Sequence, residues 1–202
     1  MVIDKKVIEN FEQRYRTTFI NSLAGFRQAV LVGTQSAEGI SNLAIFNSLI
    51  HLGANPALFG LISRPDSVPR DTLGNIMNTK VYTLNYVKTE HYKKAHQTSA
   101  RYDRTVSEFE KAGFTPFYQS NHRAPFVKEA AIRIGMQLEE CIPIAINGTI
   151  LIIGSIIEID MEDTMIGEDG FVNLSDAGIL VSQGLDAYFE TNIVGRLPYA
   201  KP

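Results

Sequence analysis

Six stretches of the chain are rich in apolar, β-branched and aromatic residues, a pattern that predicts β-strands. Four of them cover residues 26–34, 40–53, 57–63 and 80–87, and turn residues such as Asn55-Pro56 separate them. Two longer runs, 130–146 and 149–160, flank Asn147-Gly148. Because Asn-Gly between two β-rich runs is a strong hairpin signal, we expect these two runs to pair.

Helical spacing is found mainly between these stretches. Asp4 is a plausible cap for a helix with Val7, Ile8, Phe11 and Tyr15 on one side. Further helices are predicted at 70–79 and from residue 89 to Thr98-Ser99, which ends that helix. Two more are predicted at 107–113, where Gly113 ends the helix, and at 175–183, where Ser175 is the cap. Strands and helices do not alternate regularly. We therefore expect a mainly β, antiparallel, closed or nearly closed barrel with added helices, formed by residues 1–202 as one domain.

Composition and charge narrow the classes of function. The chain has 202 residues, 45% of them hydrophobic, and a formal net charge of -3, so it lacks the basic excess of a nucleic-acid-binding protein. The longest apolar run, 149–159, is too short to span a bilayer, and the charged N-terminus does not resemble a signal peptide. We expect a cytoplasmic protein with no nucleic-acid or membrane partner.

Common catalytic motifs are missing from the sequence. It has no dinucleotide-binding glycine fingerprint, no P-loop, no G-x-S-x-G and no H-E-x-x-H. The four histidines, at 51, 91, 96 and 122, do not stand at metal-ligand spacing with carboxylates. A single cysteine, Cys141, excludes an internal disulfide framework, and its strand-like surroundings indicate apolar filling rather than a nucleophile.

The segment 63–76, SRPDSVPRDTLGNI, carries the clearest chemical signal. Arg64 and Arg70 flank a loop stiffened by Pro65 and Pro69, and a helix is predicted to begin near Arg70. Guanidinium groups and the free N–H groups of a helix N-terminus both bind phosphate, and the hydroxyls of Ser63, Ser67 and Thr72 add donors. The alternative is a surface loop whose arginines pair with Asp66 and Asp71.

The strand at 41–48, SNLAIFNS, suits a flat ligand. Asn42, Ala44 and Asn47 stand among apolar residues, and small side chains let a planar ring approach the strand backbone closely. The alternative is an ordinary strand with Asn on its exposed face. A phosphate site together with such a strand indicates a site for flavin mononucleotide (FMN).

With these residues, the sequence resembles the flavin reductase-like family with the FMN-binding split-barrel fold, and within it the flavoredoxin-type branch. Family members commonly have Asn-Leu-Ala-Pro-Phe-Ser where this chain has Asn42 to Asn47, with Ile45 in place of Pro. The matching stretches are VGTQSAEGISNLAIFNS, HLGANPALFGLISRPDSVPRDTLGNI, YTLNYV, QTSARYDRTVSEFEKAGFTP, APFVKEA and the tail GLDAYF…YAKP. Together they span most of the chain in the family's order.

The resemblance implies three groups of site residues. Asn42, Leu43, Ala44 and Asn47 would line the flavin ring. Ser63, Arg64, Arg70 and Thr72 would hold the phosphate. Ser99, Ala100 and Tyr102 would come near the flavin. Asn85 is interpreted as a structural strand residue and stays outside the set.

The resemblance also implies a function. A homodimer would hold FMN at its interface, accept hydride from NADH or NADPH, and reduce a small-molecule or redox-protein acceptor, with no catalytic side chain required. One alternative is an FMN-binding electron carrier without a nicotinamide site, and another is a related barrel that binds haem or another ligand. His122-Arg123 could steer a nicotinamide phosphate or could be a solvated basic loop tip.

Overall fold

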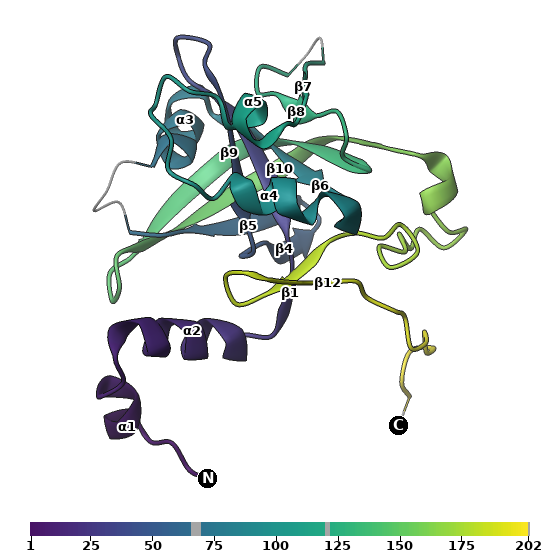
Figure 1. Cartoon of the computed structure of the whole chain (residues 1–202). Coiled ribbons are helices and arrows are strands. Elements are labelled where there is room, and N and C mark those ends of the chain that lie inside the picture. The colour runs from purple at the N-terminus through teal and green to yellow at the C-terminus, as the bar shows by residue number, and fades with distance from the viewer. Residues whose placement is uncertain (66–69, 120–121, 202) are drawn as a thin grey trace.

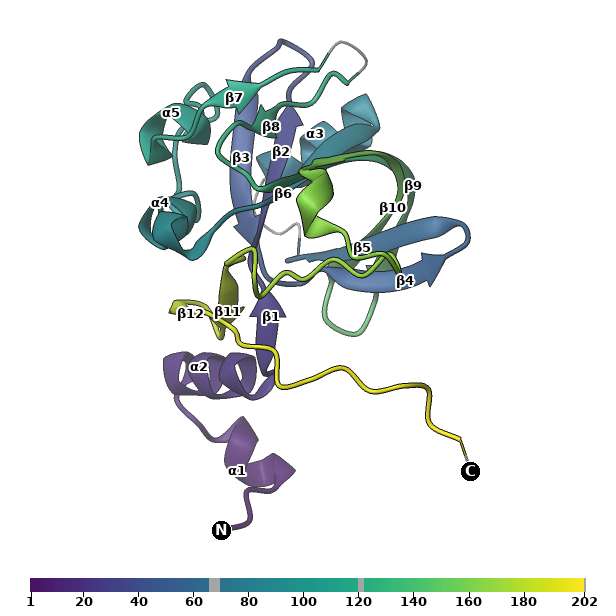
Figure 2. The same ribbon diagram turned by 90° about the vertical axis from the view of Figure 1, so that its right-hand side faces the viewer.

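The computed structural model describes residues 1–65, 70–119 and 122–201. Its centre is a seven-stranded sheet with the strand order β3-β2-β6-β9-β10-β5-β4 (Figures 1 and 2). Every pair of neighbours in it is antiparallel, as predicted. The strands are β2 (Val30–Gln35), β3 (Ser41–Phe46), β4 (Ile50–Ala54), β5 (Ala57–Ser63), β6 (Val81–Tyr86), β9 (Ile132–Ile144) and β10 (Thr149–Met161).

Two small sheets flank the large one. One has the order β1-β11-β12 and joins β1 (Phe26–Gln28) to β11 (Val181–Gln183) and β12 (Ala187–Phe189). The other pairs β7 (Pro116–Phe117) with β8 (Phe126–Val127). The first of these sheets brings together residues from the two ends of the chain.

The helices lie in two regions. The longer ones are α2 (Gln13–Leu23) and α3 (Asp71–Thr79), and the shorter ones are α1 (Lys5–Glu9), α4 (Tyr92–Gln97), α5 (Glu108–Ala112) and the 3₁₀ turns η1 (Thr89–His91) and η2 (Asp163–Met165). Helices α3, α4 and α5 pack on the barrel, whereas α1 and α2 project away from it (Figures 1 and 2). No helix among the described residues has the length and apolar character needed to cross a membrane.

Several local predictions are confirmed. Gly113 ends α5 with a positive φ of 75°, and Gly148 makes the β9–β10 turn with a φ of 74°. The Asp4 side chain accepts a hydrogen bond from the Val7 N–H and caps α1. These features depend on residues close in sequence, so the local pattern was sufficient to predict them.

Other elements differ from the prediction. The strand expected at 26–34 is divided, because β1 pairs with β11 whereas β2 pairs with β3 and β6. The strand expected at 40–53 is likewise two strands, β3 and β4. The helix expected at 175–183 is wrong. Gly178 has a φ of 64° and Ser175 donates to the carbonyl of Thr191, so the segment turns and continues as β11.

Two apolar clusters form the core. The first includes Val32, Leu61, Tyr82, Met136 and Ile152, contributed by strands from across the large sheet. The second lies under α4 and α5. Its buried members include Leu31, Leu43, Ala95, Phe109 and Leu180. The second cluster holds α5 against β3, which is the edge strand where the flavin ring was expected.

Candidate functional site

A buried polar network joins β3 to α3. The Asn42 amide nitrogen donates to the hydroxyls of Thr34, at 3.2 Å, and Thr72, at 3.0 Å. Asn75, one turn further along α3, donates to the same Thr34 hydroxyl at 3.1 Å. All four side chains are buried. The network brings the two regions predicted to hold the ring and the phosphate into contact.

The N-terminus of α3 has the features expected of an anion site. The helix begins at Asp71, Arg70 is its N-cap residue, and no side chain caps it among the described residues. The Arg70 Nε is buried and has no hydrogen-bond partner in the part of the chain that the structure describes. A guanidinium group and uncapped N–H groups at one helix end fit a phosphate.

The other residues predicted around this loop differ in exposure. Ser63 is buried, and its hydroxyl donates to the Arg64 carbonyl at 3.2 Å. The Arg64 side chain is exposed. Ser67 and Asp66 lie outside the described residues. Asp71 lies 3.7 Å from the Arg104 Nε, so the pairing proposed for Asp71 involves an arginine from a different segment.

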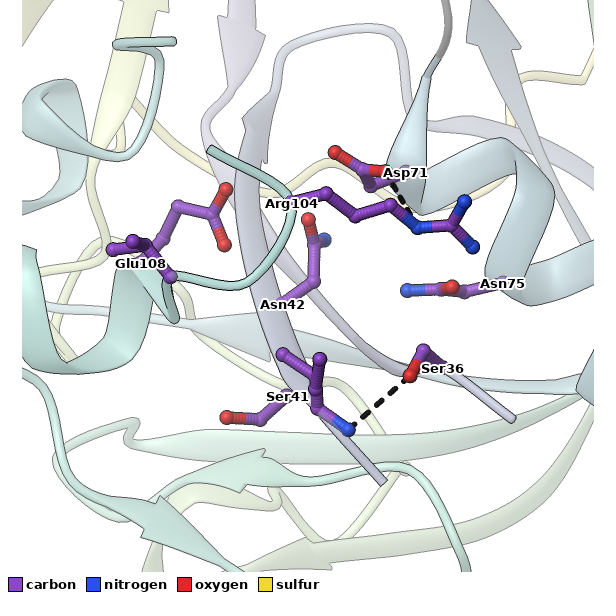
Figure 3. A pocket seen from close by; sticks show the side chains of 9 residues that line it. Ser36, Ser41, Asn42, Asp71, Asn75, Arg104 and Glu108 are labelled. Carbon is purple, nitrogen blue, oxygen red and sulfur yellow. Dashed lines mark hydrogen bonds and ion pairs between the residues drawn. The ribbon is translucent and has the colours of Figure 1, made fainter. Parts of the chain in front are cut away.

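A third segment, residues 103–108, brings Arg104 and Glu108 to the same place as Asn42 (Figure 3). The hydroxyls of Ser41 and Ser107 lie 2.7 Å apart, and the backbone N–H of Leu43 donates to a Glu108 carboxylate oxygen at 3.2 Å. The small pocket between these segments is lined by Ser36, Ile40, Ser41, Asn42, Asp71, Asn75, Arg104, Val106 and Glu108. Its volume of about 10 Å³ suffices for roughly one water molecule, so a flavin ring cannot enter it.

Burial raises the pKa of Glu108, and the nearby carboxylate of Asp71 acts in the same direction, against the hydrogen bonds from backbone N–H groups. Because the folded protein holds this proton more tightly than the unfolded chain, ionised Glu108 opposes folding at neutral pH. That cost disappears as the pH falls through the folded-state pKa.

We therefore expect Glu108→Gln to be at least as stable as the wild type at pH 7. Its side-chain oxygen can still accept from the Leu43 N–H without a buried charge. The advantage should shrink as the pH falls toward the ordinary range of a carboxyl group. Urea unfolding at neutral and mildly acidic pH measures this difference. A variant that is less stable than the wild type at neutral pH would contradict the expectation.

Some predicted residues have other contacts in this chain. The Leu43 side chain is fully buried and its N–H is bonded to Glu108, so its side chain does not face the pocket. Ala44 is half-buried, and Asn47 donates to the Gly184 carbonyl at 2.7 Å. Ser99 and Ala100 are exposed, and the Tyr102 hydroxyl accepts from Gln97. Of the predicted residues, Asn42 alone lines the pocket among the described residues.

The pocket also contains residues that the sequence did not indicate. Asn75, Arg104 and Glu108 line the pocket together with Asn42. Asn75 stands three residues after Thr72, a spacing that places both on one side of a helix and could have identified it. Arg104 and Glu108 reach the site only through tertiary packing, so no local signal in the sequence marks them.

Hydrogen bonds to backbone groups hold the side chains of Asn85, His122 and Arg123. Asn85 is buried, donates to the Leu31 carbonyl and accepts from the Val127 N–H, which agrees with its interpretation as a strand residue. His122 is also buried, with Nδ1 3.1 Å from the Ala124 carbonyl, so the solvated loop tip is wrong for this residue. The Arg123 guanidinium donates to the carbonyls of Ser36 and Ala37.

The fold of this chain is similar to that of solved structures. A protein from Shewanella frigidimarina, provisionally assigned as a flavin reductase with a split barrel domain, is 48% identical. The alignment covers 99% of this chain and 100% of that one, with a TM-score of 0.95. The fold is therefore the expected antiparallel, mainly β split barrel with added helices.

More distant structures share the same fold. Flavoredoxin of Desulfovibrio vulgaris is 16% identical with a TM-score of 0.74, over 87% of this chain and 92% of that one. An FMN-binding protein from Thermus thermophilus, with bound 1-cyclohex-2-enone, is 18% identical with a TM-score of 0.73, over 88% and 93%. The family model of the flavin reductase like domain matches residues 24–177. This protein belongs to the flavin reductase-like family.

Proposed function

We propose that this protein binds FMN and acts as an FMN-dependent NAD(P)H oxidoreductase, passing electrons to a small-molecule or redox-protein acceptor. The observation that carries the proposal is the meeting of β3 with α3 through the Asn42–Thr72 bond, beside a helix N-terminus where the Arg70 Nε is buried. The similarity to FMN-binding and flavin reductase-like proteins supports it.

The chain's own residues would bind and orient the cofactor. Arg70 and the first N–H groups of α3 would hold the phosphate, and the Asn42–Thr72–Asn75 network keeps that helix end in place beside β3. The chemistry of hydride acceptance and electron transfer would come from the bound FMN. The described residues therefore need to provide position, charge and exclusion of water.

We further propose that the active form is a homodimer in which each chain is one domain and FMN lies at the interface. The pocket beside Asn42 has room for roughly one water molecule, so a flavin ring would have to lie along the surface of a single chain. A second copy covering that surface would enclose the ring. This assembly would also keep water away from the reacting atoms.

The cofactor is tested by equilibrium binding. We expect the purified protein to carry FMN, or to take up added FMN, in preference to FAD. The physical reason is that Arg70 and α3 form one phosphate site, whereas the sequence has no dinucleotide-binding fingerprint. Fluorescence quenching titrations with FMN, FAD and riboflavin measure the three affinities. Protein that binds none of them would exclude the proposed function.

The reaction is tested separately under anaerobic conditions. Protein loaded with FMN is mixed with excess NADH or NADPH, and the visible absorbance of the flavin is followed. Bleaching within seconds is expected for a reductase. If dithionite bleaches the flavin but neither nucleotide does so over many minutes, the protein is an electron carrier reduced by a partner, as the likeness to flavoredoxin would then suggest.

A further inference from the structure

Both ends of the chain project away from the barrel and form two arms. We define the N-terminal arm as residues 1–25 and the C-terminal arm as residues 190–201. They begin at the same small sheet, where the rings of Phe26 on β1 and Phe189 on β12 lie 4.9 Å apart. In two perpendicular views both arms extend away from the body of the barrel (Figures 1 and 2).

The N-terminal arm carries an apolar stripe that is not buried by the described residues of its own chain. Phe11, Tyr15, Phe19 and Leu23 recur every four residues, and the ring of Phe11 lies 4.8 Å from that of Tyr15. No residue of α1 or α2 is buried. Isolated helices of this length are marginal in water, because most helical stability in proteins comes from packing an apolar face.

The N-terminal arm faces its own barrel with polar side chains. An open groove between α2 and the β11–β12 turn is lined on the helix side by Glu12, Gln13, Arg14, Thr17, Thr18 and Ser22. Across this groove, the Gln183 amide donates to the Ser22 carbonyl at 3.2 Å. A helix that turns polar residues to its own chain and apolar residues outward is arranged to pack on another molecule.

The C-terminal arm has no helix, but it too is fixed to its own chain and exposes apolar side chains. Its first part is held by the hydrogen bond from Ser175 to the Thr191 carbonyl and by the ion pair between Arg196 and Asp169. Its apolar side chains remain in solvent, with Leu197 92% exposed and Tyr199 90% exposed. The arm is thus fixed at its base, while Leu197 and Tyr199 stay almost wholly exposed.

The total surface area indicates what covers the arms. A folded monomer of 22.5 kDa is expected to expose about 9,500 Å², by the scaling of surface with mass. This chain exposes 12474 Å², an excess of roughly 3,000 Å². Obligate homodimers bury about 2,000–5,000 Å² in total, or roughly 1,000–2,500 Å² per chain. The excess is large enough to supply such an interface.

We propose that the two terminal arms are the homodimer contact and that each arm packs on a second copy of this chain. In a two-fold dimer the same surfaces meet twice, so both arms of both chains are covered at once. The barrel offers apolar side chains to receive them, since Ile50 and Leu52 on β4 and Ile157 and Ile159 on β10 are exposed. The two arms would then form the interface of the homodimer proposed above, so their role rests on that proposed function.

The test places charges on the arms of the full-length protein. One variant combines Tyr15→Asp with Leu23→Asp, and the other combines Leu197→Asp with Tyr199→Asp. These side chains are exposed in a single chain, so the barrel should fold unchanged. We expect the wild type to be a dimer at micromolar concentration and each variant to show a dissociation constant raised at least tenfold, measured by light scattering and sedimentation.

A matched control and a cross-link complete the test. Ile146→Asp also places a charge at a site that is 92% exposed, but in the β9–β10 turn, and it should remain a dimer. A photo-reactive side chain at position 15 should give cross-links between isotopically light and heavy chains in a mixed sample. Unchanged dimer affinity in both arm variants, a monomeric wild type, or cross-links within one chain only would overturn the proposal. A cross-linked dimer that binds no flavin would support the arms and reject the proposed function instead.

Discussion

Replacing Gly33 with alanine should lower the free energy of unfolding by about 3 kcal/mol, the upper part of the usual range for overpacking a tight core. A Cβ atom at this position would lie 2.2 Å from the carbonyl oxygen of Pro125 and 2.5 Å from the Thr83 hydroxyl. The first contact is with backbone, which cannot rotate away as a side chain can. The loop that carries His122 and Arg123 would therefore have to lift from the sheet.

The expected shift in melting temperature follows from chain length. For a domain of this size, 1 kcal/mol corresponds to about 2–4 °C, so Gly33→Ala should melt roughly 6–12 °C below the wild type. Calorimetry and urea unfolding measure the change. Gly74→Ala is the matched control, since it adds the same methyl group in α3 where no described atom outside the helix's own backbone and the neighbouring residues lies within 4 Å. This variant should be as stable as the wild type or gain up to about 1 kcal/mol in helix propensity.

Replacing Arg70 with alanine should weaken FMN binding by about 1.5–3 kcal/mol, the scale of a hydrogen bond to a charged group. This corresponds to a rise in Kd of roughly 10- to 150-fold. The effect is expected to be large because the Arg70 Nε is buried at the N-terminus of α3. Arg64→Ala should lower FMN affinity less, because Arg64 is exposed and solvent ions screen its attraction for the phosphate.

Two controls separate the phosphate contact from other effects of Arg70→Ala. Riboflavin has no phosphate, so its affinity should change much less than that of FMN. Lys128→Ala removes the same charge from an exposed position outside both arms and should leave both affinities unchanged. Isothermal titration of the wild type and the two variants with the two ligands measures the six affinities. Equal losses for FMN and riboflavin would show that Arg70 holds the protein structure rather than the phosphate.

Features that depend on neighbouring residues could be predicted from the sequence. Asn147-Gly148 marks the β9–β10 turn because an Asn-Gly pair favours the turn geometry, and Gly113 ends α5 because glycine adopts a positive φ at little cost. The β5 and α3 boundaries agree with their apolar periodicity to within a residue. The irregular order of strands and helices was also sufficient to indicate an antiparallel barrel with added helices.

Which residues meet beside Asn42 was decided mainly by tertiary packing. Leu43 is predicted to line the flavin ring, and in the structure its N–H donates to the Glu108 carboxylate because α5 packs beside β3. The bond between Asn42 and Thr72 joins residues 30 positions apart. No short-range pattern encodes it, because it depends on how α3 lies across the sheet.

The segment 175–183 has helical spacing in sequence, yet pairing with β1 and β12 makes its end a strand. The sequence alone determined the residue types available, namely two arginines around a loop with two prolines and a strand with small and amide side chains, since both depend on a few neighbouring positions. Contacts between distant segments decided which of those groups meet, because burial and hydrogen bonding are settled only when the barrel closes.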